Sequence, residues 1–498
     1  MKIFRLFPQD SSGARLRLFA ILLLALIWCL VGWRYCYKPG ARDGASSTTA
    51  DKSEPNEPVA TPFHASPADG LPRCSKQKMG GVSLDQVDDN VYVMVKSPGG
   101  NSDVPMKNIS WIVTDGGVVM IDTGVLQSAL IAKTLIQKTT DKPIMYIIYT
   151  HNHGTNVLGT GIFKTRSTKV IAQEDFVLEF ERAVNMPDYF NRINSIQFDV
   201  DPMIYDKDQK YDALLPDLTY QSEYEFTLGQ TRFHLYHAVG EAADYSIIFM
   251  PDQKIVWTGD MTGFGVPNVA SPMKPVRDAI RWKKALELIK SLDPDVLIGS
   301  VAEPVCDKRQ IAIMLEARIN YLDFLHKAVA NELNQGSTLE ETLENTKLPP
   351  PLAHHPLLQD LYLSHEFNVR GLFQMYSGWF DQNGSHLKPA PSKQRAESFI
   401  RDMGGAQKVL DRAGGLRAAK DLKLALEYLD LLIAAGERSS EAHRIKSAIL
   451  DEMSLLYEHK MTANMYRYLA KIELQQAAQK SSEGANHSPR SISGTSGK

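Results

Sequence analysis

Two histidines, His151 and His153, stand two residues apart just after the apolar run 144–149 and Thr150. Such a run predicts a buried strand, and alternating side chains or a tight loop at its end can turn both imidazoles toward one cavity. Neutral imidazole is a common ligand of zinc and of other transition metals. The pair therefore indicates a metal site, although 13 histidines in 498 residues make a chance His-x-His pair a competing interpretation.

Carboxylates at the ends of other predicted strands strengthen the first interpretation. Glu241 follows the predicted strand 233–236 through a short loop, and Asp260 ends a further apolar run. Both acids are predicted metal ligands together with the histidine pair. Asp260 is also the predicted catalytic residue, either as the fourth ligand or as the group that orients a water molecule. Asp122 is instead predicted to be a structural acid that accepts hydrogen bonds from loop amides.

The elements that must position these side chains follow from the periodicity of the chain. Up to about Val305, short β-branched runs alternate with the predicted helices 126–139 and 276–291. This mixture of hairpin-like pairs and crossovers is typical of an α/β fold. The predicted strands are 91–95, 109–113, 118–121, 144–149, 170–172, 233–236, 246–250, 254–258 and 296–298.

Beyond Val305 the strand signals stop and helical signals continue. Leu422, Ala425, Leu429 and Leu432 fall on one helical face, and a second apolar stripe follows at 442–456. Gly436 separates the two stripes and ends the first helix. The pattern predicts an all-α domain that contains an antiparallel helix pair of the tetratricopeptide kind.

The first part of the chain carries a targeting signal. Residues 18–33 contain no charged side chain, and basic residues flank them on both sides. Trp28 and Trp33 lie where aromatic side chains anchor a span at the membrane interface. We expect residues 1–37 to form a signal anchor with a single transmembrane helix and the catalytic domain on the exported, periplasmic or extracytoplasmic side. A cleaved signal peptide is the alternative.

Composition divides the rest of the chain into a flexible linker at 38–75, an α/β domain at 76–310, a helical domain at 311–480 and a disordered tail at 481–498. The formal net charge is -3 without a long run of one sign, so we expect no nucleic-acid partner. Cys74 and Cys306 are the thiols of the exported part, and the sequence leaves open whether they pair.

The order of these motifs resembles the metallo-β-lactamase superfamily. The matching segments are Asp122-Thr123-Gly124, His151-Asn152-His153, Gly240-Glu241 and Gly259-Asp260. Glutamate at the third ligand position, Pro267-Asn268, the segment around Arg277 and the segment 376–387 are similar to the alkyl sulfatases. The resemblance covers about 82–474. It implies an αββα sandwich followed by the helical alkyl sulfatase dimerisation domain, and hence a homodimer.

The chain departs from the family pattern at one of two metal positions. Where the family has H-x-H-x-D-H and a later histidine, this chain has Thr155, Asn156 and Val301. His151, His153, Glu241 and Asp260 remain. The resemblance therefore implies a mononuclear centre, for which we expect one zinc ion, with iron as the alternative.

On this resemblance we expect a metal-dependent hydrolase in which metal-bound hydroxide attacks a sulfate or other ester of a hydrophobic alcohol, a small-molecule substrate. Thr155, Asn156, Asn268 and Arg277 are the predicted substrate-binding residues, although an arginine on a helix is more often structural. The alternative function is a catalytically impaired binding or interaction protein of the same fold, because three ligands of the second metal are missing.

Overall fold

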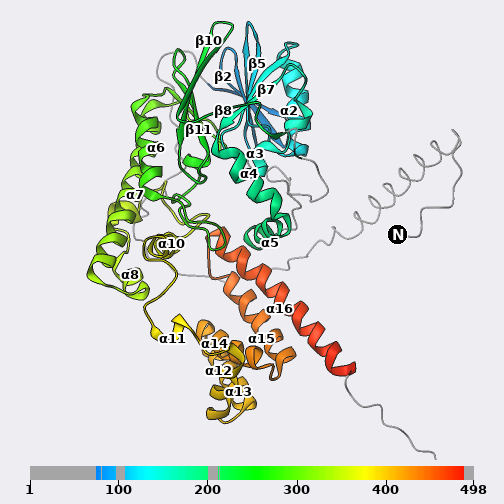
Figure 1. Cartoon of the computed structure of the whole chain (residues 1–498), viewed down its shortest axis with the longest axis vertical. Helices are drawn as coiled ribbons and strands as arrows, with labels where there is room; N and C mark the ends of the chain where they lie inside the picture. Colours follow the sequence, from blue (N-terminus) through cyan, green and yellow to red (C-terminus); the bar gives the residue numbers. More distant parts are fainter. Residues whose placement is uncertain (1–73, 80, 97–106, 200–210, 212–213, 487–498) are drawn as a thin grey trace, which may run out of the picture. The chain divides into compact units, whose positions relative to one another are not determined.

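The computed structural model describes residues 74–79, 81–96, 107–199, 211 and 214–486. In these ranges the chain forms two β-sheets, with α2 against the first sheet and α6 and α7 against the second (Figure 1). A helical region follows the second sheet. The predicted α/β sandwich followed by helices is therefore confirmed.

The first sheet has eight strands in the order β1-β2-β3-β4-β5-β6-β7-β8. Neighbouring strands are antiparallel from β1 to β5 and parallel from β5 to β8. The carboxyl ends of β5 and β6 consequently meet at one edge of the sheet. The strands are β1 (Ser75–Met79), β2 (Val82–Asp88), β3 (Val91–Lys96), β4 (Ile109–Thr114), β5 (Gly117–Ile121), β6 (Ile144–Ile148), β7 (Lys169–Gln173) and β8 (Leu218–Tyr220).

The second sheet has five strands in the order β13-β12-β11-β10-β9. β12 and β13 are parallel, and the other neighbours are antiparallel, so β10, β12 and β13 all run in one direction. Their carboxyl ends share an edge. The strands are β9 (Glu223–Leu228), β10 (Thr231–Ala238), β11 (Tyr245–Met250), β12 (Ile255–Gly259) and β13 (Val296–Gly299).

The alternation of side chains along the strands forms three apolar cores between the layers of helices and sheets. Val118 and Met120 of β5 belong to a core that they share with α2 and α4, whereas Val119 and Ile121 belong to the core shared by the two sheets. On the second sheet, residues such as Ile247 face a third core that includes α6 and α7. Because successive side chains of a strand point to opposite faces, each sheet can bury both faces. The layers are therefore helix, sheet, sheet and helix.

Helices of the α/β part connect the strands and cover the outer faces. The bounds are α2 (Leu126–Thr139), α3 (Gly154–Val157), η1 (Thr160–Ile162), α4 (Asp175–Asn185), α5 (Pro187–Phe198), η3 (Asp260–Thr262) and α6 (Ala279–Ser291).

The later helices divide between two cores. Residues of α7, α8 and α10 join the core outside the second sheet, and α12 to α15 form a core of their own. The bounds are α7 (Lys308–Gln335), α8 (Leu339–Asn345), α9 (Pro350–Ala353), α10 (His365–Ser377), α11 (Gly384–Leu387), α12 (Ser392–Asp402), α13 (Ala406–Ala418), α14 (Leu422–Ala435), α15 (Ser439–Ser454) and α16 (Lys460–Asn486).

The two cysteines whose pairing the sequence left open form a disulfide. Cys74, just before β1, is bonded to Cys306, just before α7, with their Cα atoms 6.6 Å apart. The predicted anchor at 1–37 lies outside the described residues, as do most of the predicted linker and residues 487–498 of the predicted tail. Among the helices that are described, none is long and apolar enough to cross a membrane.

Candidate metal centre

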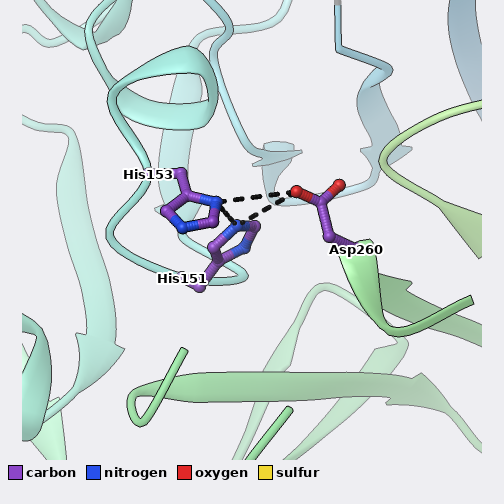
Figure 2. A group of neighbouring side chains, drawn as sticks. All are labelled: His151, His153 and Asp260. Carbon is purple, nitrogen blue, oxygen red and sulfur yellow. Dashed lines mark hydrogen bonds and ion pairs between the residues drawn. The ribbon is translucent and has the colours of Figure 1, made fainter. Parts of the chain in front are cut away.

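The cluster of His151, His153 and Asp260 lies where strand ends from both sheets meet. The histidines occupy the loop between β6 and α3, and Asp260 directly follows β12. One ligand atom from each side chain lies within 4.8 Å of the other two, and Figure 2 shows the three groups facing one point. The structure thus brings together three of the four predicted ligands.

The separations within the cluster suit a single metal ion. His151 Nε2 lies 2.8 Å from His153 Nδ1. Asp260 Oδ2 lies 3.5 Å from His151 Nε2 and 3.6 Å from His153 Nδ1. Two ligand atoms about 2.0–2.1 Å from one tetrahedral zinc ion are about 3.3 Å apart. The two distances to Asp260 Oδ2 fit such an ion, whereas the two imidazole nitrogens are in hydrogen-bond contact and would have to move apart to bind it.

A hydrogen-bonded chain fixes the tautomer of His151. Thr150 Oγ1 donates to Asp122 Oδ2 at 2.7 Å and therefore accepts from His151 Nδ1 at 2.9 Å. With its proton on Nδ1, His151 presents the lone pair of Nε2 to the cluster. Asp122 also accepts the backbone N–H of Thr150 at 2.8 Å. The prediction that Asp122 is a structural acid is confirmed.

Tyr245 and Gly259 determine the position of Asp260 in the cluster. The Tyr245 ring stacks on His151 with centroids 4.4 Å apart, and its hydroxyl oxygen accepts the Asp260 N–H at 3.1 Å. Gly259 has φ +57°, and a Cβ atom there would lie 2.5 Å from Tyr245 Cε1. Only glycine therefore lets β12 deliver Asp260 beside this ring.

Lys107 is a member of the site that the sequence did not indicate. Its Nζ atom donates to both carboxylate oxygens of Asp260, at 2.7 Å each. Burial opposes the ionisation of Asp260, but the Lys107 ammonium and the two histidines outweigh it and hold the pKa of that carboxyl well below its ordinary value. Lys107 lies two residues before the start of β4 and in no motif, so only the fold reveals its role.

Glu241 lies close to the cluster but outside the group of three. Its Oε1 accepts from Asn268 Nδ2 at 2.6 Å and lies 3.5 Å from Arg277 Nη2. Arg277 Nε also donates to the Glu241 backbone carbonyl at 3.0 Å. The predicted substrate-binding residues Asn268 and Arg277 thus hold the predicted ligand Glu241 in this structure.

Thr155 and Asn156, which replace two family ligands of the second metal, contact neighbouring loops rather than the cluster. Asn156 is fully buried, and its Nδ2 donates to Asp122 Oδ2 at 2.7 Å and to Ser300 Oγ at 3.1 Å. Thr155 Oγ1 donates to Asn156 Oδ1 at 3.3 Å. Asn156 of α3 is therefore bonded to the loop after β5 and to the loop after β13.

Burial shifts the pKa of two side chains around the cluster. Burial and the neighbouring His151 lower the pKa of His153 to about 4, so its imidazole is neutral at pH 7. Lys274 is also close by, and burial and the neighbouring Arg277 lower its pKa to about 8. Lys274 Nζ lies 5.8 Å from the centroid of the Phe198 ring.

Two family matches account for most of the described chain. Residues 103–300 match the family described as the metallo-beta-lactamase superfamily. Residues 338–476 match the family described as alkyl sulfatase dimerisation. The matches fall on the two-sheet part and on the helical part respectively.

Curated proteins similar to this chain are named as alkyl sulfatases. A linear primary-alkylsulfatase from a Pseudomonas species is 26% identical over 66% of this chain and 67% of its own length. An (R)-specific secondary-alkylsulfatase from Pseudomonas is 25% identical over 72% of this chain and 58% of its own length. An alkyl/aryl-sulfatase from Saccharomyces cerevisiae is 25% identical over 80% of this chain and 64% of its own length. The chain thus spans between 58% and 67% of the length of these relatives.

A solved structure agrees on the fold. The stereoselective inverting sec-alkylsulfatase Pisa1 from Pseudomonas superposes with a TM-score of 0.69 at 22% identity, over 79% of this chain and 65% of that one. The two-sheet fold and the cluster at its edge define a protein of the metallo-β-lactamase superfamily. Within it, the chain belongs to the alkyl sulfatase family with the dimerisation domain, so the resemblance drawn from the motif order is confirmed.

Proposed function

We propose that this chain is a metal-dependent hydrolase of a sulfate or other ester of a hydrophobic alcohol, and that one metal ion, zinc in the first instance, binds between His151, His153 and Asp260. The observation that carries the proposal is the convergence of these three ligand atoms within 4.8 Å at the edge shared by both sheets. Glu241 is the proposed fourth ligand. The family and the names of the relatives support the reaction class.

The surrounding residues have separate roles in this proposal. A bound metal ion would supply Lewis-acid chemistry and would lower the pKa of a water molecule. His151 is held in the ligand tautomer by Thr150, and His153 is neutral, so both can offer a lone pair. Asp260 would hold the metal ion through one carboxylate oxygen, while Lys107 bonds to the other. Thr155 is the proposed hydrogen-bond partner of a substrate oxygen beside the cluster.

Cationic and aromatic side chains near the cluster suit an anionic ester with an apolar alcohol. Lys274 and Lys107 offer ammonium groups to a sulfate, and the Phe198 ring beside Lys274 offers an apolar surface to the alkyl part. Arg277 donates to the backbone carbonyl of Glu241. Because a carboxylic ester is neutral, these cations favour a sulfate ester over it.

Hydrolysis of matched substrates tests the proposal. Purified protein should release sulfate from a medium-chain alkyl sulfate, should act more slowly on the carboxylic ester of the same alcohol, and should lose the activity with a chelator and regain it with zinc. An activity that survives complete metal removal, or no activity on either ester with metal present, contradicts the proposal. The second result favours the binding-protein alternative.

We also propose a homodimer on the exported side of a membrane, held by the N-terminal span. The match to the dimerisation family supports the dimer. The Cys74–Cys306 disulfide supports an oxidising compartment, because such bonds persist mainly outside the cytosol. Membrane fractionation of the full chain and of a form without residues 1–37 tests the anchor, since only the full chain should pellet with membranes.

A further inference from the structure

The ion pair between Lys107 and Asp260 is sheltered from solvent. The Lys107 side chain is 17% exposed and the Asp260 side chain 8% exposed. Both Nζ–Oδ distances are 2.7 Å, so the ammonium is shared by the two oxygens. An ammonium at this depth gains much more from its partner carboxylate than an exposed lysine does.

The backbone beside Lys107 is fastened to the loop after β13. The Asn108 N–H donates to the Ser300 carbonyl at 2.8 Å. Asn108 Nδ2 donates to the carbonyls of Gly299 at 2.9 Å and Ala302 at 2.7 Å. Lys107 therefore extends from an anchored position at the same sheet edge as the cluster, and its ammonium is built into the site.

Asp260 consequently lies between the Lys107 ammonium and the place that a metal ion bound by His151 and His153 would occupy. His151 and His153 approach one of its oxygens, Oδ2, at 3.5 and 3.6 Å. The Lys107 ammonium contacts this oxygen and also Oδ1, which the histidines do not approach as closely. A metal ion held by the histidines and Oδ2 would leave Oδ1 to the ammonium.

We propose that Lys107 is a built-in second cation of this centre, which shares Asp260 with one metal ion and lowers the affinity for that ion by like-charge repulsion. The inference rests on the proposed function, because it needs the metal site at His151 and His153. It also gives a physical reason for a mononuclear centre in this chain: the ammonium holds the side of Asp260 that a second ion would need. Two positive charges a few ångströms apart repel each other, and one carboxylate between them offsets that repulsion only in part.

Zinc titration of the full-length protein by calorimetry tests this role without reference to activity. Lys107→Met removes the charge, Lys107→Gln removes it but keeps a hydrogen-bond donor, and Lys107→Arg keeps it. We expect the first two variants to bind one zinc ion at least tenfold more tightly than the wild type, and Lys107→Arg to stay within threefold of it. Lys164→Met is the matched control. Lys164 forms a partly buried ion pair with Asp217, with Nζ and Oδ2 3.1 Å apart, and neither residue belongs to the cluster.

The outcomes separate this inference from the proposed function. If the wild type binds one zinc ion but Lys107→Met and Lys107→Gln bind it equally or less tightly, Lys107 only shapes Asp260 and the inference is overturned while the metal site stands. If the neutral variants bind zinc and the wild type does not, the ammonium excludes the metal and the shared arrangement is wrong. If no form binds zinc, the proposed function and the inference fail together.

Discussion

At the scale of single residues, the site depends on groups that hold the ligands rather than on the ligands alone. Thr150 Oγ1 links the Asp122 carboxylate to His151 Nδ1 through two hydrogen bonds, of 2.7 and 2.9 Å. Such supporting partners typically change metal affinity by about 10- to 100-fold when they are removed. The buried carboxylate thus acts on the metal position without touching it.

Thr150→Val should weaken zinc binding by at least about tenfold, because His151 Nδ1 loses its acceptor and the ring can adopt the other tautomer. Calorimetric titration with zinc measures the change. Thr134→Val is the matched control, since Thr134 Oγ1 donates only to the Leu130 carbonyl on α2. Equal affinity of the Thr150 variant and the wild type would show that the hydrogen-bonded chain does not prepare His151.

Gly259→Ala should unfold at a lower temperature and lose zinc binding, because its Cβ atom would meet the Tyr245 ring and its φ of +57° is unfavourable for alanine. We expect a loss of about 2–4 kcal/mol in the free energy of unfolding. Gly263→Ala is the control, with φ −64° and its nearest contact at an ordinary 3.6 Å. Equal melting temperatures for both variants would contradict this account of how Asp260 is placed.

The candidate site was only partly predictable. His151, His153 and Asp260 each follow a strongly apolar strand, so local periodicity alone placed them at sheet edges. Lys107 is 153 residues from Asp260, and Tyr245 begins an apolar strand where an aromatic residue normally signals core packing. Contacts between distant segments have no local pattern, so the sequence could not indicate these two residues.

At the scale of elements, nine predicted strands coincide with strands of the two sheets, and the helix 126–139 agrees with α2 at both ends. The strands that were missed are β1, β2, β8 and β9. β9 alternates glutamate with aromatic and apolar residues at the edge of its sheet, and none of its side chains is fully buried. Edge strands need fewer apolar residues, and therefore their sequence signal is weaker.

Helix α10 connects the helical layer to the loop that carries Asn268. Asn368 Nδ2 donates to the Pro267 carbonyl and to the Tyr321 hydroxyl, at 2.8 Å each, and its Oδ1 accepts from Ala270 N–H at 3.0 Å. His365 Nε2 donates to the Thr346 carbonyl at 2.8 Å, which leaves Nδ1 to accept from Tyr321 at 3.0 Å. This network requires a neutral His365.

His365 should make stability depend on pH. Burial lowers the pKa of His365 below its ordinary value of 6.5 and outweighs the opposing effects of Thr346 and Asp360. A lowered pKa in the folded state means that the unfolded chain binds more protons below about pH 6.5, so stability is full above that pH and declines as the pH falls toward the folded-state pKa. In urea unfolding, His365→Gln should lose less stability than the wild type between about pH 7.5 and 5.5. Identical losses would exclude His365 as a source of the dependence.

At the scale of the whole molecule, the disulfide joins segments that are 232 residues apart in sequence. Closing so long a loop restricts the unfolded chain strongly. Cys74→Ser should therefore lower the free energy of unfolding by about 2–4 kcal/mol, and reductant should shift the denaturation midpoint of the wild type but not of the variant. A wild type that is insensitive to reductant under unfolding conditions would show that the bond contributes nothing to stability.

The division of the helices between two cores could not be read from the sequence. The stripes at 422–433 and 442–456 predicted helices, and α14 and α15 occupy those positions. An apolar stripe shows that a helix face is buried but not against what. α7 and α10 cover the second sheet, whereas α14 packs with α12, α13 and α15.

The zinc content of the purified protein tests the central claim most directly. Elemental mass spectrometry should find close to one zinc ion per chain in the wild type and in His234→Ala, a matched histidine variant on β10 outside the cluster. His151→Ala and Asp260→Ala should each lose that ion, because each removes one of three converging ligands. A wild type with no metal or with about two ions per chain, or a His151→Ala protein that keeps its full metal content, would contradict the mononuclear centre.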